Sequence, residues 1–127
     1  MMDKNIKILI VDDFTTMRKV IRNLLKSVGY ENIIEAEDGA IALRTLKNNE
    51  VDFIISDWNM PNMSGLELLK AVRADSELSK TPFLMVTAEA LQDNVIAAVK
   101  AGVSNYIVKP FTAEVLNTKI EKILETL

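Results

Sequence analysis

One pattern, repeated five times along the chain, constrains the fold more than any other feature: a short apolar run, a polar loop and a segment of helical period. The runs lack the polar alternation of half-exposed strands, which is typical of parallel strands covered on both faces. They end near positions 11, 36, 57, 87 and 108 of the 127 residues. That spacing suits units of one strand and one helix, and right-handed crossovers between such units build an open α/β sandwich. A closed barrel of eight units needs about twice the length.

The same pattern places the expected strands and helices. The strand runs cover residues 6–11, 33–36, 53–56, 83–86 and 106–108. After the first run, apolar residues such as Phe14, Met17 and Ile21 recur three or four positions apart, which predicts an amphipathic helix. Asp38 stands where an N-cap is expected, and Gly29 where a helix would end in the left-handed conformation. The sequence therefore predicts one α/β domain with five strands and five helices.

Two residue types that carry much enzyme chemistry are missing. The sequence contains no cysteine and no histidine. Their absence excludes disulfides, zinc sites built on thiolate or histidine, cysteine nucleophiles and Ser-His-Asp machinery. The four glycines fit neither the dinucleotide fingerprint nor a Walker loop. Any chemistry must therefore use carboxylates, hydroxyls, lysines and the main chain.

Charge and hydropathy narrow the expected location and partners. The 15 basic and 18 acidic residues give a net charge of −3, which disfavours a sequence-independent grip on nucleic acid. The N-terminal segment lacks the layout of a signal peptide, and no apolar stretch approaches the roughly 18 residues of a membrane span. We expect a cytoplasmic protein that neither binds nucleic acid nor inserts into a membrane.

Polar side chains follow the strand runs at the carboxyl ends, where open parallel sheets bind their ligands. Asp12 and Asp13 follow the first run and Asp57 the third, so these carboxylates converge if the two strands are neighbours. Two unit charges roughly 4 Å apart repel by about 4 kcal/mol at an effective dielectric near 20. Such a cluster must take up protons or hold a cation. Oxygen ligands alone favour a hard ion, and a small number of protein ligands favours Mg²⁺ over Ca²⁺.

A hydroxyl and an ammonium complete this set of strand-end groups. Thr87 ends the fourth run and Lys109 follows the fifth, and both can bind the oxygens of an anion seated on the acids. With one carboxylate as nucleophile, this describes phosphoryl transfer to an aspartate. Asp57 is favoured as acceptor because it stands singly beside a loop, although spacing alone leaves the choice open. Plainer roles also remain open: Asp12 and Asp13 as helix caps, Lys109 as a solvated side chain and Thr87 as a strand residue.

These residues and their spacing resemble the response-regulator receiver domains of two-component signalling. The motifs that carry the resemblance are Asp12-Asp13, Asp57, Thr87-Ala88 and Lys109-Pro110-Phe111. The resemblance covers essentially the whole chain, so it implies a single receiver domain over residues 1–127 with no output domain. It further implies a flavodoxin-like, doubly wound sheet of strand order 2-1-3-4-5. Segments 11–14, 57–63 and 87–90 are most similar to the chemotaxis regulators within the family.

The resemblance also implies roles in catalysis. Asp57 is implied as the phospho-acceptor, with Lys109 and Thr87 binding the phosphoryl oxygens. The implied Mg²⁺ ligands are Asp12, Asp13, Asp57 and the main-chain carbonyl of Asn59. Asn59 and Glu89, two positions after Asp57 and Thr87, are implied to influence how fast the phosphate is lost. The Lys109-Pro110 bond is implied to be cis, a form that only a bond to proline adopts at low cost.

Output is implied to depend on an aromatic switch and a protein partner. Tyr106 is implied to move inward when Thr87 shifts toward the phosphate. The face of the fourth helix, fifth strand and fifth helix is then expected to bind the flagellar motor switch protein. Lys119 and Lys122 share one side of the last helix and are expected to meet an acidic segment of that partner, although two solvated lysines are the plainer alternative. Further expected partners are a histidine kinase of the chemotaxis pathway and a dedicated phosphatase, with the protein itself a monomer.

Other interpretations stay open. The nearest keeps the receiver and changes the pathway, to another two-component system or a phosphorelay with a further histidine protein. A Mg²⁺-dependent phosphohydrolase usually carries a second acid two positions after its nucleophile, where this chain has Asn59. An FMN-binding protein fits the fold, but acid-lined loops repel the FMN phosphate. We therefore expect a switch that is no enzyme in the usual sense and catalyses only its own phosphorylation and dephosphorylation.

Overall fold

Five parallel strands form one sheet in the computed structural model, which describes residues 4–88 and 92–126, with the backbone alone at 92 and 93. The strands are β1 (Ile8–Val11), β2 (Ile33–Ala36), β3 (Phe53–Asp57), β4 (Phe83–Thr87) and β5 (Asn105–Val108). Their order across the sheet is β2-β1-β3-β4-β5, and every pair is parallel. The predicted fold class and strand order are confirmed.

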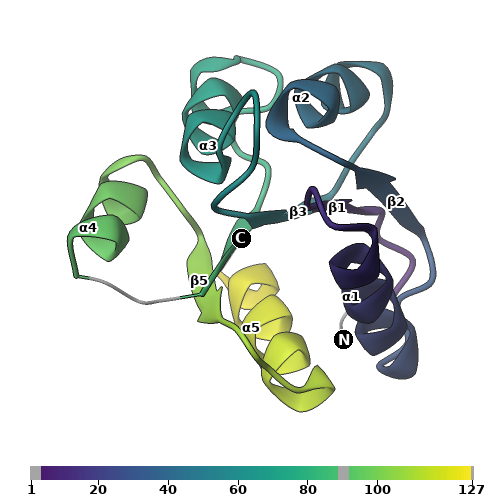
Figure 1. The fold of residues 1–127 in the computed structure, drawn as a ribbon. Coiled ribbons are helices and arrows are strands. Elements are labelled where there is room, and N and C mark those ends of the chain that lie inside the picture. Colours follow the sequence, from purple (N-terminus) through teal and green to yellow (C-terminus); the bar gives the residue numbers. More distant parts are fainter. Residues whose placement is uncertain (1–3, 89–91, 127) are drawn as a thin grey trace.

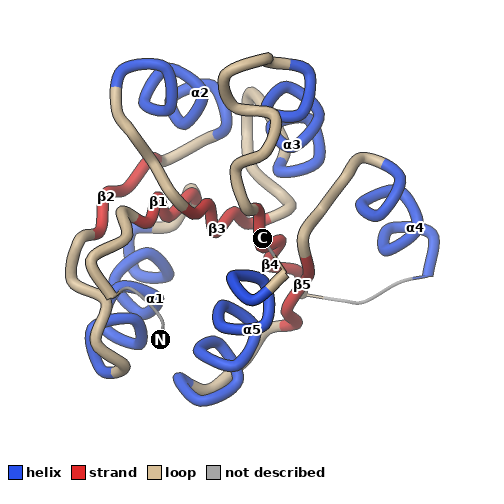
Figure 2. The backbone as a smooth tube through the Cα atoms, turned by 180° about the vertical axis from the view of Figure 1, so that it is seen from behind, coloured by secondary structure: helices blue, strands red, loops and turns tan. Residues whose placement is uncertain are grey.

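Five helices cover the two faces of this sheet. They are α1 (Thr15–Ser27), α2 (Gly39–Asn48), α3 (Gly65–Ala74), α4 (Gln92–Lys100) and α5 (Ala113–Glu125). Helices α1 and α5 lie on one face, and α2, α3 and α4 lie on the other (Figure 1), an arrangement that the reverse view also shows (Figure 2). None of the helices described is long and apolar enough to cross a membrane.

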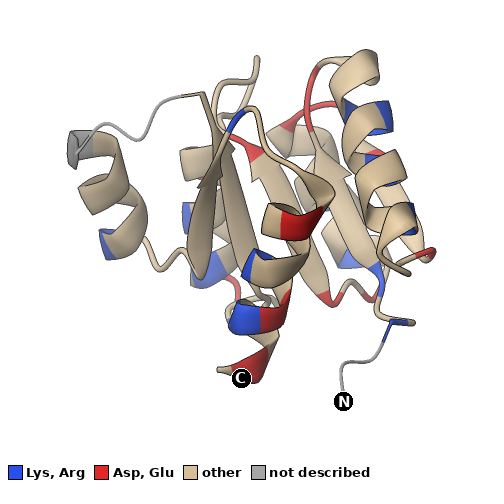
Figure 3. Cartoon of the chain, turned by 90° about the horizontal axis from the view of Figure 1, so that it is seen from below, with Lys and Arg blue, Asp and Glu red and all other residues tan. Residues whose placement is uncertain are grey.

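The two layers of helices explain why the strands are apolar at successive positions. In β1, Ile8 and Ile10 pack into the core beneath α1 and α5, whereas Leu9 and Val11 pack into the core beneath α2 and α3. Because neighbouring residues of a strand point to opposite faces, a sheet covered on both sides buries all of them. Charged residues fall mainly on helices and loops (Figure 3), and the five strands contain only Glu35 and Asp57.

The ends of the elements differ slightly from the predicted ones. The first strand begins at Ile8 rather than at position 6, because Ile8 is the first residue paired with both neighbouring strands. Strands β3 and β4 each extend by one residue and include the polar Asp57 and Thr87. The predicted N-cap is confirmed, since the Asp38 carboxylate accepts a hydrogen bond from the Ile41 amide at 2.9 Å.

Candidate functional site

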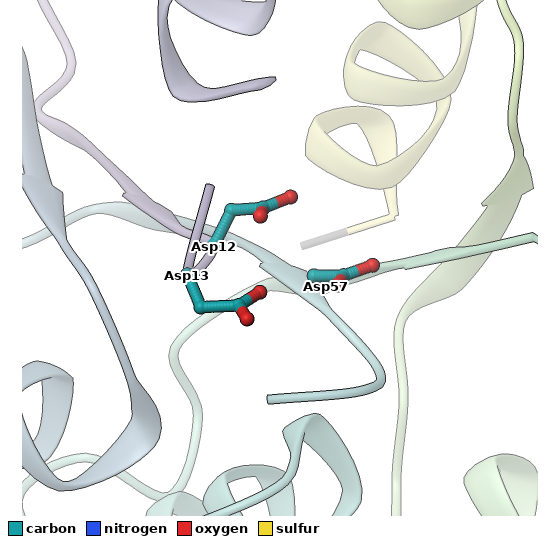
Figure 4. Close-up of side chains that lie close together, drawn as sticks. All are labelled: Asp12, Asp13 and Asp57. Atoms are coloured by element: carbon teal, nitrogen blue, oxygen red, sulfur yellow. The ribbon is translucent and has the colours of Figure 1, made fainter. Parts of the chain in front are cut away.

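Three carboxylates meet at the carboxyl edge of the two central strands. Strands β1 and β3 are parallel neighbours with Val11 opposite Ser56, so the residues after Val11 lie beside Asp57. One carboxylate oxygen from each of Asp12, Asp13 and Asp57 lies within 4.8 Å of the other two. Figure 4 shows the three side chains projecting into the same region. The expected convergence of these acids is confirmed.

This cluster is electrostatically unfavourable on its own. Asp12 is fully buried, and burial is the main cause that raises its pKa above the ordinary value. The Phe14 N–H lowers this pKa, the charge of Asp57 raises it, the Lys109 ammonium lowers it and the charge of Asp13 raises it. Asp12 Oδ2 and Asp13 Oδ1 are buried and have no hydrogen-bond partner in the part of the chain described. Orphaned anionic oxygens of this kind fit a hard divalent cation, so the donor set suits Mg²⁺.

Asp12 and Asp13 do not cap the first helix. The N-cap residue of α1 is Phe14, and the helix begins at Thr15. The Asp12 side chain instead accepts a hydrogen bond from the Phe14 amide at 2.9 Å, within the turn that precedes the helix. The capping interpretation is therefore wrong, because helix geometry starts too late for either acid to serve as the cap.

Lys109 is held against the acid cluster. Its Nζ lies 2.9 Å from Asp57 Oδ1. Its main-chain N–H donates to the Thr87 carbonyl at 2.8 Å, which ties the loop after β5 to the end of β4. The Lys109-Pro110 peptide bond is cis, as the family resemblance implied. The alternative of a lysine surrounded by solvent is therefore wrong, while the phosphoryl-binding roles of Lys109 and of the buried Thr87 stay predictions.

The loop after β3 is held close to Asp57 by a glycine. A Cβ on Gly65 would clash with the Asp57 carbonyl oxygen, so no side chain fits there. The Gly65 amide donates to the Trp58 carbonyl at 2.8 Å, which closes the loop onto the start of α3. Asn59 is exposed in this loop, and its carbonyl as a metal ligand stays a prediction. Glu89, the other residue implied to affect phosphate loss, lies outside the described residues.

Tyr106 and Lys119 lie together, whereas Lys122 lies elsewhere on α5. The Lys119 Nζ is 5.4 Å from the centre of the half-buried Tyr106 ring. Both residues line a hollow of about 350 Å³ over β5 and α5, together with Val108, Phe111 and others. Lys122 is exposed and lines a second, polar hollow of α5 with neighbouring glutamates. The structure thus joins the predicted switch aromatic to one of the two predicted partner-binding lysines.

Sequence reasoning missed an arginine pair beside the acids. Arg18 Nη1 donates to the Asp12 carbonyl at 2.7 Å, and its Nε donates to Glu35 at 3.0 Å. Arg22 also donates to Glu35, at 2.8 Å. Two arginines four positions apart share a helix face, and Glu35 interrupts an apolar strand run. That combination was the signal from which an ion pair at this place could have been predicted.

The chain is similar in sequence and in fold to known signalling proteins. Residues 8–121 match the profile of the response regulator receiver domain. The chain is 59% identical to a chemotaxis protein CheY of Pseudomonas aeruginosa over 94% of this chain and 96% of that protein. It is 55% identical to chemotaxis protein CheY-3 of Vibrio cholerae, over 99% and 97%. It also matches the solved structure of the receiver domain of a sensor histidine kinase from Pseudomonas aeruginosa, with a TM-score of 0.86 and 28% identity over 95% of this chain and 98% of that one. That structure has a magnesium ion coordinated in its active-site cleft.

Proposed function

The chain belongs to the response-regulator receiver family and is closely related to chemotaxis proteins, and on that premise we propose that it is a phosphorylation-activated switch of bacterial chemotaxis. It takes a phosphoryl group from a histidine kinase onto Asp57 and then binds the flagellar motor switch protein. The observation that carries the proposal is the contact of Lys109 Nζ with Asp57 Oδ1 at 2.9 Å beside two further carboxylates. Phosphoryl transfer needs a nucleophilic carboxylate, a positively charged side chain that binds the phosphoryl oxygens, and further carboxylates that can hold a metal ion.

Asp57 acts as the nucleophile in this proposal. One of its oxygens forms the new P–O bond while the P–N bond to the donor histidine breaks, and the electron pair stays on the imidazole. The residues that would hold Mg²⁺ are Asp12, Asp13, Asp57 and the main-chain carbonyl of Asn59. When bound, Mg²⁺ neutralises charge on the phosphoryl oxygens and orients the group for in-line transfer. Lys109, already beside Asp57, offers its ammonium to a phosphoryl oxygen, and Thr87 offers its hydroxyl from the end of β4.

Switching follows from the change in charge at Asp57. Phosphorylation replaces a singly charged carboxylate with a group of charge near −2 that has more acceptor oxygens. Thr87 moves toward these oxygens, and β4 pairs with β5 so that Met85 lies opposite Tyr106. The half-buried Tyr106 ring then moves inward, away from Lys119. This is a shift between two packings of one fold rather than the creation of a new one.

The face formed by α4, β5 and α5 is the proposed output surface. These elements carry four of the exposed large apolar side chains, namely Ile96, Val99, Val108 and Val115. Lys119 and Lys122 add positive charge on α5, which suits an acidic segment of the motor switch protein. The protein acts in the cytoplasm as a monomer, and a dedicated phosphatase is a further proposed partner.

A second assignment keeps the chemistry and changes the pathway, to another two-component system or a phosphorelay. The identities of 55% and 59% to proteins named for chemotaxis favour the first assignment. Expression in a chemotactic bacterium that lacks its own regulator separates the two. Restored reversals of the flagellar motor support the chemotaxis assignment. Normal phosphorylation without any effect on the motor supports the other one.

Incubation with acetyl phosphate and Mg²⁺, followed by mass spectrometry, tests the chemistry directly. We expect one phosphoryl adduct that hydroxylamine removes, as it removes acyl phosphates, and no adduct in Asp57→Asn. Asp52→Asn is the matched control, because Asp52 is an exposed acid before β3, outside the acid cluster, and its carboxylate accepts a hydrogen bond from the Lys7 amide at 2.8 Å. An adduct that persists in Asp57→Asn would show that another residue is the acceptor.

A further inference from the structure

Arg18 reaches from α1 to the loop that carries two of the acids. Its Nη1 donates to the Asp12 carbonyl at 2.7 Å, and its Nη2 contacts Thr15 Oγ1 at 3.3 Å. The Asp12 amide still donates to the Ala36 carbonyl of β2, at 3.2 Å, but Asp12 lies beyond the end of β1. Arg18 therefore supplies the Asp12 carbonyl with a donor at the point where strand pairing ends.

A glutamate on the neighbouring strand anchors the arginine. Arg18 Nε lies 3.0 Å from Glu35 Oε1, and Arg22 Nη2 lies 2.7 Å from Glu35 Oε2. Burial raises the pKa of Glu35, but the hydrogen bonds from Arg22 and Arg18 outweigh it, so this pKa lies below its ordinary value and Glu35 is ionised at neutral pH. The Arg18 side chain is only 15% exposed. A planar guanidinium bound on both edges is far more restricted than a surface lysine.

We propose that Arg18 is a positioning residue for the metal site, which fixes the peptide of Asp12 and thereby keeps the Asp12 and Asp13 carboxylates close to Asp57. The inference rests on the proposed function, because that function is what calls for Mg²⁺. Substituting a group that orients metal ligands in this way typically weakens metal binding by roughly ten- to hundredfold.

The charge of Arg18 alone predicts the opposite effect. A cation near the acids repels Mg²⁺, so a purely electrostatic role predicts tighter Mg²⁺ binding when Arg18 is removed. A positioning role predicts weaker binding, because the ligands lose their arrangement. The sign of the change in Mg²⁺ affinity therefore separates the two roles.

Titration of the intact protein with Mg²⁺, followed by the fluorescence of Trp58 next to Asp57, tests this proposal. Arg18→Met keeps the aliphatic stem and loses the donors, and we expect about tenfold weaker Mg²⁺ binding. Arg18→Lys keeps the charge but cannot bridge Glu35 and the Asp12 carbonyl, so its affinity should fall similarly. The matched control, Arg22→Met, removes the second ion pair of Glu35 but no hydrogen bond to Asp12, and it should bind Mg²⁺ like the wild type. At saturating Mg²⁺, Arg18→Met should regain the wild-type rate of phosphorylation by acetyl phosphate.

Three results would overturn the positioning role: unchanged or tighter binding in Arg18→Met, equal weakening in Arg22→Met, or wild-type affinity in Arg18→Lys. Urea unfolding without Mg²⁺ verifies that each variant is folded, and Arg18→Lys carries the test if Arg18→Met does not fold. The proposed function fails separately, if the wild type does not bind Mg²⁺ or if Asp13→Asn binds it equally well. Wild-type binding with unaffected Arg18 variants refutes only the role of Arg18.

Discussion

The acid cluster stores a repulsion that one nearly isosteric substitution, Asp13→Asn, should release. The three carboxylate oxygens lie within 4.8 Å of one another. At an effective dielectric of about 20, two unit charges at that separation repel by about 3.5 kcal/mol. Asp13 is only half-buried, and Lys109 offsets part of the charge of Asp57, so solvent and counter-charge reduce this value. We therefore expect Asp13→Asn to raise the free energy of unfolding by about 1–2 kcal/mol without Mg²⁺.

Mg²⁺ should reverse the sign of this difference. A ligand that binds only the folded state stabilises it by about 2.7 kcal/mol when its concentration is a hundred times its Kd. The wild type should gain that stability and Asp13→Asn should not, because it lacks one of the anionic ligands. Urea unfolding followed by far-ultraviolet circular dichroism, with EDTA and then with Mg²⁺, measures both effects.

Asp52→Asn serves as the control for a lost negative charge away from the cluster. Its free energy of unfolding should change by less than about 0.5 kcal/mol in either condition. The reasoning is refuted if Asp13→Asn is less stable than the wild type in EDTA, or if Mg²⁺ stabilises both proteins equally.

Three further predictions concern the helix cap, the core and the switch. Asp38→Ala should lower the free energy of unfolding by about 1 kcal/mol at pH 7. Because the hydrogen bonds from the Ile41 amide and then the Asn62 side chain lower the pKa of Asp38, this difference should disappear as the pH drops below about 4. Urea unfolding over a pH series measures it, and a difference that persists at low pH would contradict the prediction. Tyr30→Phe should raise the free energy of unfolding by about 1 kcal/mol, since the buried Tyr30 hydroxyl has no partner among the residues described, and a loss of stability would show that the hydroxyl is satisfied. Tyr106→Ala should leave phosphorylation by acetyl phosphate intact and abolish motor reversals; loss of phosphorylation would instead place Tyr106 in the chemistry.

The order of the elements and the meeting of the acids could be predicted because both follow from burial along the chain. A strand covered on both faces is mostly apolar, so the acid that follows an apolar run marks the strand's end, as Asp12 does after β1. Parallel strands have all their carboxyl ends at one edge, so residues that end neighbouring strands are close in space. The convergence of Asp12 and Asp57 required only that β1 and β3 be neighbours.

Interactions that depend on the reach of a single side chain could not be predicted in the same way. Lys119 and Lys122 lie on the same side of α5 in a helical projection, but of these two only Lys119 lines the hollow beside Tyr106. Aspartate is a common N-cap residue, so Asp12 and Asp13 were plausible caps from their type. Only the observed start of α1 at Thr15 shows that Phe14 is the N-cap residue. Arg18 belongs to no sequence motif, and the hydrogen bonds that its guanidinium makes to Glu35 and to the Asp12 carbonyl follow from the three-dimensional arrangement of α1, β2 and the loop after β1.

The charge balance of the site explains why the same carboxylates that repel one another also suit the binding of a divalent cation. When ionised, the three carboxylates carry three negative charges, and Lys109 on Asp57 neutralises one, so the remaining deficit equals the charge of one divalent cation. A second lysine that paired with the unpartnered oxygens of Asp12 and Asp13 would stabilise the metal-free protein, but it would also remove the attraction for Mg²⁺. If Mg²⁺ balances the site as proposed, a phosphoryl group on Asp57 would add about one further negative charge. In the proposed function, Thr87 at the end of β4 supplies a donor for that added charge, and the pairing of β4 with β5, which places Met85 opposite Tyr106, is the route by which its movement would reach Tyr106.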